Sequence, residues 1–491
     1  MQRTVVLNVV GLAGAFIGKH TPHLRRLLSE GSFVPVAPAF PAVTCTAQAD
    51  YLTGRRPREH GIVGNGWYHR ELAEVHFWKQ SNHLVTAPKL WEDLRRADPG
   101  FTCAKLFWWF NMYSSADYSV TPRPMYPADG RKVFDIYTRP PELRHILQRE
   151  LGPFPFATFW GPAAGVKSPQ GAPDAATRWI AAAARWIEAQ YRPTLHLVYL
   201  PHLDYNLQRH GPFAPDPAGG PPPVAFGRRT LNPAILPDLA AVDALVGELR
   251  AFFESRGVQV VVLSEYGLSN VNRPIHLNRL FREQGWIAVR EELGRELLDP
   301  GASAVFAVAD HQVAHLYLNQ PDLAPRVRAL VEERTGATVL GPPEKAALGL
   351  DHPRAGDLVA VAPEAAWFTY YYWLDDRVAP DFARTVDIHR KPGYDPVELF
   401  TDPALSPLAL RARIAWRLLQ KRLGFRMLMD VIPLDATLVK GSHGRRPERV
   451  ADWPVLLVNR PGTLPPGPIE STAVYAVLRG LIAGATRGES G

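Results

Sequence analysis

Residues 40–62 read FPAVTCTAQADYLTGRRPREHGI, and this stretch decides how the rest of the chain is interpreted. A threonine in a turn, as Thr44 is here, most often caps a helix. Thr44 is followed by a run of mixed polar and apolar residues that ends at Gly54. The surrounding sequence determines whether Thr44 also has a chemical role.

Short apolar runs rich in β-branched residues recur on both sides of this stretch, and each is followed by a polar turn. Such runs are typical of buried parallel strands. They span residues 4–10, 194–200, 258–263 and 454–458. Amphipathic helical stretches alternate with them at residues 21–29, 90–96, 174–190, 238–256 and 471–482. The alternation predicts an α/β protein with a mainly parallel sheet covered on both faces.

The sheet pattern is interrupted after Gly267 by a long segment of mixed character with proline-rich joints, and it resumes at Pro454. We therefore expect three parts: a core α/β part over residues 1–270, a cap or insert over 271–439, and a return to the core over 440–491. Ligands of open α/β sheets bind outside the carboxyl ends of the strands. The polar residues that follow each strand are therefore the candidates for a site.

The chain has 491 residues, of which 46% are hydrophobic and 21% charged, as in globular proteins. Its net charge of +7 comes from scattered arginine pairs rather than a continuous basic stripe, so we expect no nucleic acid polymer as a partner. Two cysteines form no disulfide framework, and no run is apolar enough to span a bilayer. We expect a cytoplasmic protein, and the sequence does not reveal its oligomeric state.

Five ordered landmarks resemble the nucleotide pyrophosphatase/phosphodiesterase branch of the alkaline phosphatase superfamily. The block 40–62 matches the branch without a gap, and the helix over 21–31 precedes it as in the branch. The other landmarks are the loops at 199–204, 262–268 and 441–444. The resemblance implies an alkaline-phosphatase-like, three-layer α/β/α core with an inserted cap.

The resemblance also implies a chemistry. It places Thr44 at the position of a nucleophilic threonine, and the branch binds two divalent cations, usually zinc. A metal ion stabilises the threonine alkoxide, and a second one stabilises the charge on the phosphoryl and leaving oxygens. The implied substrate is a phosphorylated small molecule, and the intermediate is a covalent phosphothreonine or nucleotidylthreonine.

Several ligand positions of the branch are substituted in this chain. The aspartate after the first strand aligns with Val10, although Asn8 lies two residues back on the same strand face. The histidine that follows Asp204 by four residues is Gln208, and the Asp-His pair is Glu265-Tyr266. Among these positions, those identical to the branch are Thr44, Asp204 and His443.

Three hypotheses about the metal site stay open. Substitute ligands come from elsewhere, with candidates in the runs 387–391 and 310–315 and at His202. Alternatively one ion is held by Asp204 and His443 with Gln208 or Glu265, an oxygen-rich set that suits Mg or Mn better than Zn. In the third hypothesis metal binding is lost, and the pocket recognises a ligand without hydrolysing it.

Further candidates surround these positions. His389 lies among an aspartate, Arg390 and Lys391, so we expect it to point into the pocket of Thr44, where the two cations hold a phosphate in place of a missing metal. Gln48 and Asn65 are candidate donors to phosphate oxygens.

The function predicted from the sequence is that of a phosphoric ester hydrolase of the phosphodiesterase or nucleotide pyrophosphatase type, with a threonine nucleophile at a remodelled metal site. The alternative is a catalytically altered or inactive relative that binds a phosphorylated small molecule, or a phosphoryl or nucleotidyl transferase.

Overall fold

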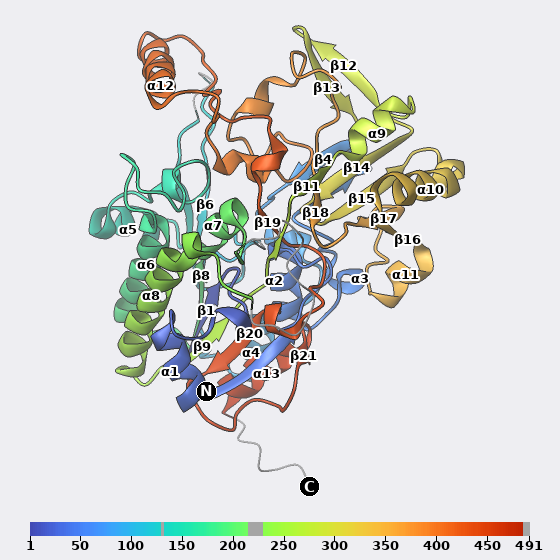
Figure 1. Cartoon of the computed structure of the whole chain (residues 1–491). Coiled ribbons are helices and arrows are strands. Elements are labelled where there is room, and N and C mark those ends of the chain that lie inside the picture. Colours follow the sequence, from blue (N-terminus) through green and yellow to red (C-terminus); the bar gives the residue numbers. More distant parts are fainter. Residues whose placement is uncertain (129–131, 215–228, 485–491) are drawn as a thin grey trace.

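The centre of the molecule is a nine-stranded sheet in a computed structural model that describes residues 1–128, 132–214 and 229–484 (Figure 1). The strand order is β21-β2-β20-β9-β1-β8-β5-β6-β7. In that order the strands are β21 (Ile469–Glu470), β2 (Ser32–Ala37), β20 (Val455–Val458), β9 (Gln259–Leu263), β1 (Thr4–Val9), β8 (Leu195–Leu200), β5 (Cys103–Leu106), β6 (Tyr118–Pro122) and β7 (Ile136–Arg139).

Five neighbouring strands of this sheet, from β9 to β6, are parallel, whereas β20 and β7 are antiparallel to their neighbours. β1 lies in the middle, where Asn8 is in register with Tyr199 of β8 and Leu263 of β9. All residues of β1, β8 and β9 are buried, as expected for β-branched runs covered on both faces. The four strands predicted from the sequence are confirmed, and so is the mainly parallel α/β fold.

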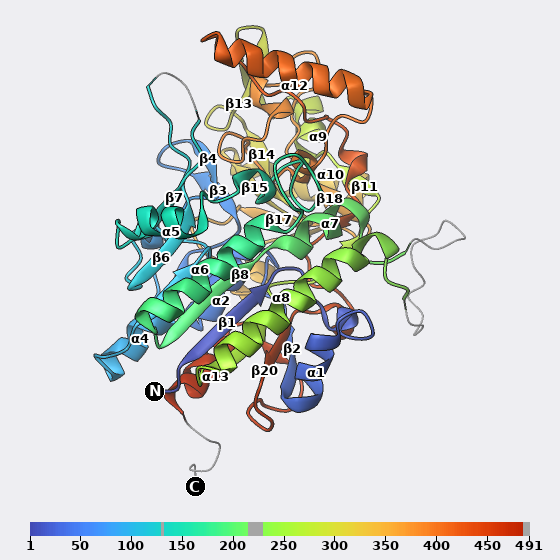
Figure 2. The same cartoon turned by 90° about the vertical axis from the view of Figure 1, so that its left-hand side faces the viewer.

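Helices cover both faces of the sheet, which gives three layers (Figure 2). One layer contains α1 (Pro22–Glu30), α5 (Leu143–Leu151), α6 (Ala175–Tyr191), α7 (His202–His210) and α8 (Leu236–Glu254). The other contains α2 (Thr44–Thr53), α4 (Leu90–Ala97) and α13 (Ala473–Ala483), which pack on one another. The short helix α3 (Pro57–His60) follows α2.

A second apolar core lies beside the main sheet, mostly within the segment expected as an insert (Figure 1). Its antiparallel sheet contains β14 (Val305–Asp310), β15 (Val313–Leu318), β17 (Leu358–Val361) and β16 (Thr338–Leu340). Two-stranded pairs join β3 (Gly66–His69) with β4 (Glu74–Phe77), β11 (Arg273–Ile275) with β18 (Ala366–Phe368), and β12 (Ala288–Glu292) with β13 (Arg295–Asp299). The helices here are α9 (Leu277–Glu283), α10 (Ala324–Thr335) and α11 (Pro342–Ala347).

Two further elements complete the described chain. The pair β10 (Ser269–Asn270) and β19 (Gly441–Ser442) brings the segment after β9 next to the segment before His443. The helix α12 (Pro407–Arg422) lies at the edge of the molecule, far from the end where α1 and α13 lie (Figures 1 and 2). Among the described residues, we find no helix long and apolar enough to cross a membrane.

Candidate active site

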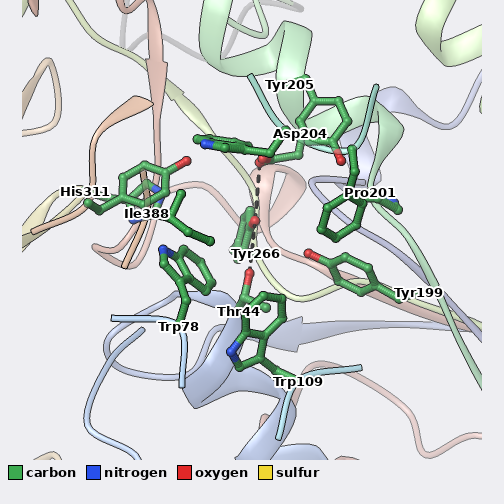
Figure 3. Close-up of a pocket in the computed structure, with 13 residues that line it drawn as sticks. Thr44, Trp78, Trp109, Tyr199, Pro201, Asp204, Tyr205, Tyr266, His311 and Ile388 are labelled. Atoms are coloured by element: carbon green, nitrogen blue, oxygen red, sulfur yellow. Dashed lines mark hydrogen bonds between the residues drawn. The ribbon is translucent and has the colours of Figure 1, made fainter. Parts of the chain in front are cut away.

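A small cavity of about 70 Å³ lies where the carboxyl ends of β8 and β9 meet the start of α2 (Figure 3). Thr44 is the first residue of α2, and its side chain reaches the cavity wall. Parallel strands deliver their carboxyl ends to one edge of the sheet, so residues far apart in the sequence meet here. The cavity is lined by Thr44, Trp78, Trp109, Phe159, Trp160, Tyr199, Pro201, Asp204, Tyr205, Tyr266, His311, Ile388 and Tyr394.

A chain of hydrogen bonds runs from Thr44 to Asp204 through Tyr266 (Figure 3). The Thr44 Oγ1 atom is 3.5 Å from the Tyr266 hydroxyl, which donates to Asp204 Oδ1 at 3.3 Å. The other oxygen of Asp204 accepts from Gln208 Nε2 at 2.6 Å, and Gln208 Oε1 accepts from the Tyr394 hydroxyl at 2.9 Å. These contacts give Thr44 an indirect connection to a carboxyl group.

A second buried carboxyl, that of Glu265, lies behind Thr44. Its Oε1 atom accepts hydrogen bonds from Asn8 Nδ2 at 2.6 Å and from Gln48 Nε2 at 2.5 Å. Gln48 Oε1 in turn accepts from the backbone N–H of Trp109 at 2.6 Å. Gln48 Oε1 and Glu265 Oε1 are therefore both engaged within the protein. Gln48 links α2 to the segment after β5.

Four rings form a continuous stack beside this chain. Tyr266 lies flat on His443 with 3.5 Å between ring centroids, His443 lies 3.7 Å from His311, and His311 lies 3.6 Å from Tyr394. All four side chains are buried. His311 has a φ of 62°, in the left-handed region that a residue with a Cβ seldom adopts, so the turn between β14 and β15 holds its ring in the stack against a local strain.

Backbone hydrogen bonds hold His443 between the turn before Thr44 and the turn that carries His311. His443 Nδ1 donates to the carbonyl oxygen of Ala42 at 2.8 Å, and the Gly444 carbonyl accepts from the Ala42 N–H at 2.8 Å. On the other side the His443 carbonyl accepts from the N–H of Gln312, also at 2.8 Å. Gly444 has a φ of 118°, and a Cβ there would lie 3.0 Å from Gln312 N, so this close approach needs glycine.

Burial disfavours the charged form of every titratable group at the site. It raises the pKa of Asp204 to about 7, although hydrogen bonds from Gln208 and Tyr266 oppose the shift. It raises the pKa of Glu265 to about 8 against the hydrogen bonds from Gln48 and Asn8. The same burial lowers the pKa values of His311 and His443 well below their ordinary value. At pH 7 Glu265 is therefore largely protonated, Asp204 is protonated in about half of the molecules, and both imidazoles are uncharged.

Asn65, predicted as a phosphate donor, is engaged within the protein. Its backbone N–H and its side-chain amide donate to the two oxygens of Asp310 at 2.8 and 3.0 Å, and its Oδ1 accepts from the N–H of Cys45 at 3.0 Å. Asp310 also contacts His311 Nδ1 at 2.8 Å. Asn65 thus connects the start of α2 to the histidine stack rather than presenting a free amide.

The segment 388–391 differs from the expectation. Ile388 lines both the Thr44 cavity and a larger cavity that adjoins it, whereas His389 lines the larger cavity alone, and its Nδ1 lies 3.3 Å from the carbonyl oxygen of Phe77. Arg390 is exposed and forms an ion pair with Asp381 at 2.8 Å.

Lys391 is buried, and its ammonium group lies 2.7 Å from Asp395 and 2.8 Å from Glu398. Because carboxylates already neutralise both Arg390 and Lys391, these cations do not hold a phosphate at Thr44. The expectation fails because Asp381 pairs with Arg390, and Asp395 and Glu398 neutralise Lys391.

The donor set does not fit the two-zinc site that the resemblance implies. Within residues 1–128, 132–214 and 229–484, no three His, Cys, Asp or Glu side chains are grouped so that they could hold a metal ion. Gln208 uses its amide on Asp204 and Tyr394, and Tyr266 occupies the face of His443. His202, another possible substitute, is engaged by Asp238, whose Oδ1 lies 2.8 Å from His202 Nε2. Other potential ligand atoms, among them His443 Nε2, His311 Nε2 and Glu265 Oε2, are buried without a hydrogen-bond partner among the described residues, but they belong to no group of three that could hold an ion.

Sequence reasoning missed several residues of the site. Tyr199, near the end of β8, and Trp109, in the segment after β5, line the cavity. Tyr394 is the last ring of the stack. The Tyr205 hydroxyl and Trp109 Nε1 are buried without a hydrogen-bond partner among the described residues. The signal for Tyr199 and Tyr205 was available, because both flank the predicted Asp204 loop after a strand.

Comparison with known proteins agrees with this architecture. Murine ectonucleotide pyrophosphatase/phosphodiesterase 5 superposes over 98% of this chain and 95% of its own, with 14% sequence identity and a TM-score of 0.54. Phosphonoacetate hydrolase from Sinorhizobium meliloti 1021, in complex with phosphonoformate, superposes over 99% and 96%, with 15% identity and a TM-score of 0.56. No curated protein sequence matches the chain significantly.

The three layers, the strand order and the position of the site define an alkaline-phosphatase-like α/β fold. The family model for type I phosphodiesterase/nucleotide pyrophosphatase matches residues 4–395. The chain belongs to this family.

Proposed function

We propose that this chain hydrolyses a phosphoric ester of the phosphodiesterase or nucleotide pyrophosphatase type, with Thr44 as the nucleophile. The observation that carries the proposal is the hydrogen-bond chain from Thr44 through Tyr266 to Asp204 at the cavity wall. A threonine hydroxyl needs a base to become a nucleophile, and a carboxyl with a pKa of about 7 is suited to that task near neutral pH.

The proposed reaction has two displacements at phosphorus. In the first, Thr44 Oγ1 forms a bond to phosphorus while its proton passes to the Tyr266 oxygen and the Tyr266 proton passes to Asp204. The bond from phosphorus to the leaving oxygen breaks, and the leaving alkoxide takes the proton back from Asp204 through Tyr266. In the second displacement water attacks the phosphothreonine, and its proton follows the same path until Thr44 is released as an alcohol.

The developing negative charge needs hydrogen-bond donors that are fixed before the reaction. Tyr205 OH and Trp109 Nε1 have no partner among the described residues and belong to cavity-lining side chains. Thr44 lies at the N-terminus of α2, where the helix dipole favours an anion. These groups support binding of a phosphoryl oxygen without a cationic side chain.

Relatives support a small phosphorylated substrate. One solved structure of murine ectonucleotide pyrophosphatase/phosphodiesterase 5 is an inactive variant, with a threonine replaced by alanine, in complex with AMP. The phosphonoacetate hydrolase structures contain phosphonoformate or phosphonoacetate. A nucleotide or phosphonate ester is accordingly the substrate class we propose to screen first.

One observation favours a second function, which is binding without hydrolysis. Among the described cavity-lining residues there is no lysine or arginine, and the side chains at four ligand positions of the branch are Val10, Gln208, Glu265 and Tyr266. Such a relative would bind AMP and leave phosphodiesters intact.

Turnover of bis(p-nitrophenyl) phosphate by the wild type, Thr44→Ser and Thr44→Ala decides between the two functions. The hydrolase retains activity with serine and loses it with alanine. Saturable AMP binding in all three proteins, with no turnover by any of them, would establish the second function instead.

A further inference from the structure

The helix α12 exposes an apolar stripe to solvent. Leu408, Ala412, Trp416, Leu419 and Leu423 follow one another at spacings of four, four, three and four residues, which places them on one face of a helix. All five are exposed, Leu408 by 78% and Trp416 by 56%. No residue of α12 is buried. An ordinary surface helix directs such a stripe at the core.

Ion pairs on the opposite side of α12 keep the stripe facing outward. Arg413 and Arg417 lie on that side, and both donate to the carboxylate of Asp430 at 2.9 to 3.0 Å. The Ser406 side chain caps the helix by accepting from the N–H of Ala409. Leu410 and Ile414, which face away from the stripe, also pack against the second apolar core, so the orientation of the stripe is fixed by contacts with the body of the molecule.

Apolar exposure continues past the end of the helix. Phe425 and Leu428 are 65% and 42% exposed. Together with Leu408, Trp416, Leu418, Leu419 and Leu423 they account for seven of the nineteen large apolar side chains that the described residues expose. We call residues 406–428 the apolar-basic segment.

The charge of the apolar-basic segment has a single sign. It contains six cationic residues, Arg411, Arg413, Arg417, Lys421, Arg422 and Arg426, and no aspartate or glutamate. Beyond the two arginines paired with Asp430, we find no ion pair for the other four among the described residues. Arg411 and Arg422 lie along one edge of the apolar stripe on the helix surface. An apolar face with Trp and Leu, bordered by unpaired cations, is the composition of helices that lie in the interface of a bilayer.

A large, mostly apolar cavity of about 500 Å³ lies directly beneath the apolar-basic segment, with Lys132 and His389 among the polar side chains of its wall. Ile414 and Leu418 of α12 form part of its wall, and Leu418 is also 51% exposed, so the cavity reaches the surface next to the stripe. Other lining side chains are Phe134, Val386 and Val431. At its inner end the cavity shares Trp109, Phe159, Trp160 and Ile388 with the Thr44 cavity.

We propose that the apolar-basic segment docks on an anionic lipid surface and that the cavity beneath it accepts the apolar chain of a lipid from that surface. The stripe enters the boundary between headgroups and acyl chains, and the unpaired cations contact anionic headgroups. The cavity has the volume and the apolar walls for a chain of fatty-acid type. Both parts concern binding alone, so they hold or fail independently of the proposed hydrolysis.

Sedimentation with vesicles tests the docking. The full-length protein is expected to bind phosphatidylcholine vesicles that contain phosphatidylglycerol, and to bind pure phosphatidylcholine at least tenfold more weakly. Arg411→Glu/Arg422→Glu and, separately, Leu419→Ser/Leu423→Ser are expected to weaken binding about tenfold or more. Leu72→Ser and Arg25→Glu, which change exposed residues far from the segment in sequence, are matched controls that keep full binding.

Two results would overturn the docking. One is equal binding to neutral and anionic vesicles, or none to either. The other is a concentration-dependent dimer that Leu419→Ser/Leu423→Ser dissociates, because a second copy of the chain would then cover the stripe.

Fluorescence titration with cis-parinaric acid tests the cavity. Saturable binding is expected, and Ile414→Trp, which places a larger side chain at the wall, is expected to weaken it about tenfold, whereas Leu72→Ser leaves it unchanged. Binding that is absent, or that Ile414→Trp does not alter, would refute the cavity as a chain site. Unfolding midpoints of all variants are measured first, so a loss of binding is read only from folded protein.

Discussion

Replacing Glu265 by glutamine tests whether the site is neutral. The Glu265 carboxyl accepts two amide hydrogens on Oε1, while its Oε2 atom is buried without a partner among the described residues. A proton on Oε2 removes an uncompensated buried charge, and this is why burial raises its pKa to about 8. Glutamine keeps an oxygen for the two amides and carries no charge at any pH, so it imitates the protonated acid.

The magnitude follows from linkage. A carboxyl with a pKa of about 8 in the folded protein and 4.5 in the unfolded chain binds more protons when folded, so the stability it contributes falls as the pH rises. At 1.36 kcal/mol per pKa unit, the contribution decreases by about 3 to 4 kcal/mol between pH 5 and pH 8. The stability that Asp204 contributes also falls as the pH rises, because burial raises its pKa from 3.8 to about 7. The wild type is therefore expected to lose stability over this range.

The assay is urea denaturation of the wild type and Glu265→Gln at pH 5 and pH 8. The stability of the variant relative to the wild type is expected to increase by about 3 to 4 kcal/mol from the lower to the higher pH. Glu291→Gln, which removes an exposed carboxylate from β12, is the control and should show little change. A relative stability of Glu265→Gln that does not change with pH, or that decreases, would refute the neutral site.

Three further predictions concern the proton path and the core. Tyr266→Phe removes the hydroxyl between Thr44 and Asp204. We expect this variant to hydrolyse bis(p-nitrophenyl) phosphate with a kcat about 100-fold lower and with little change in KM. An unchanged kcat would show that the proton takes another path. Wild-type kcat is expected to rise with pH around pH 7 as Asp204 ionises, and a pH-rate profile that falls there would contradict its role as base. Leu263→Ala in β9 is expected to lower the free energy of unfolding by about 2 to 5 kcal/mol, measured by urea denaturation, because the side chain is fully buried.

Much of the core could be predicted from the sequence because its central strands are rich in apolar, β-branched residues. The runs that became β1, β8, β9 and β20 are mostly apolar and buried throughout, and this pattern is typical of strands covered on both faces. The reversed direction of β20 could not be predicted, since burial is the same for either direction.

The site could be predicted in part. Asp204, Tyr266 and Thr44 each follow a strand or begin a helix at one edge of the sheet, and the structure brings them together. Tyr394 and His311 come from the second apolar core, and their stacking depends on packing between two cores that no local pattern encodes.

The segment after residue 386 shows why charge alone misleads. Three charged residues next to His389 suggested a phosphate site, but Lys391 is neutralised by Asp395 and Glu398. The apolar-basic segment could not be predicted as a surface feature for the opposite reason. Its apolar residues have helical spacing, which ordinarily predicts a face directed at the core. In the structure this face is exposed to solvent.

In the proposed reaction side chains alone activate Thr44, and turnover by metal-depleted protein tests this claim. After dialysis against a chelator, and with the metal content verified by mass spectrometry, the wild type is expected to hydrolyse bis(p-nitrophenyl) phosphate at its original rate. Activity that disappears on depletion and returns on addition of Zn²⁺, Mn²⁺ or Mg²⁺ would contradict the claim.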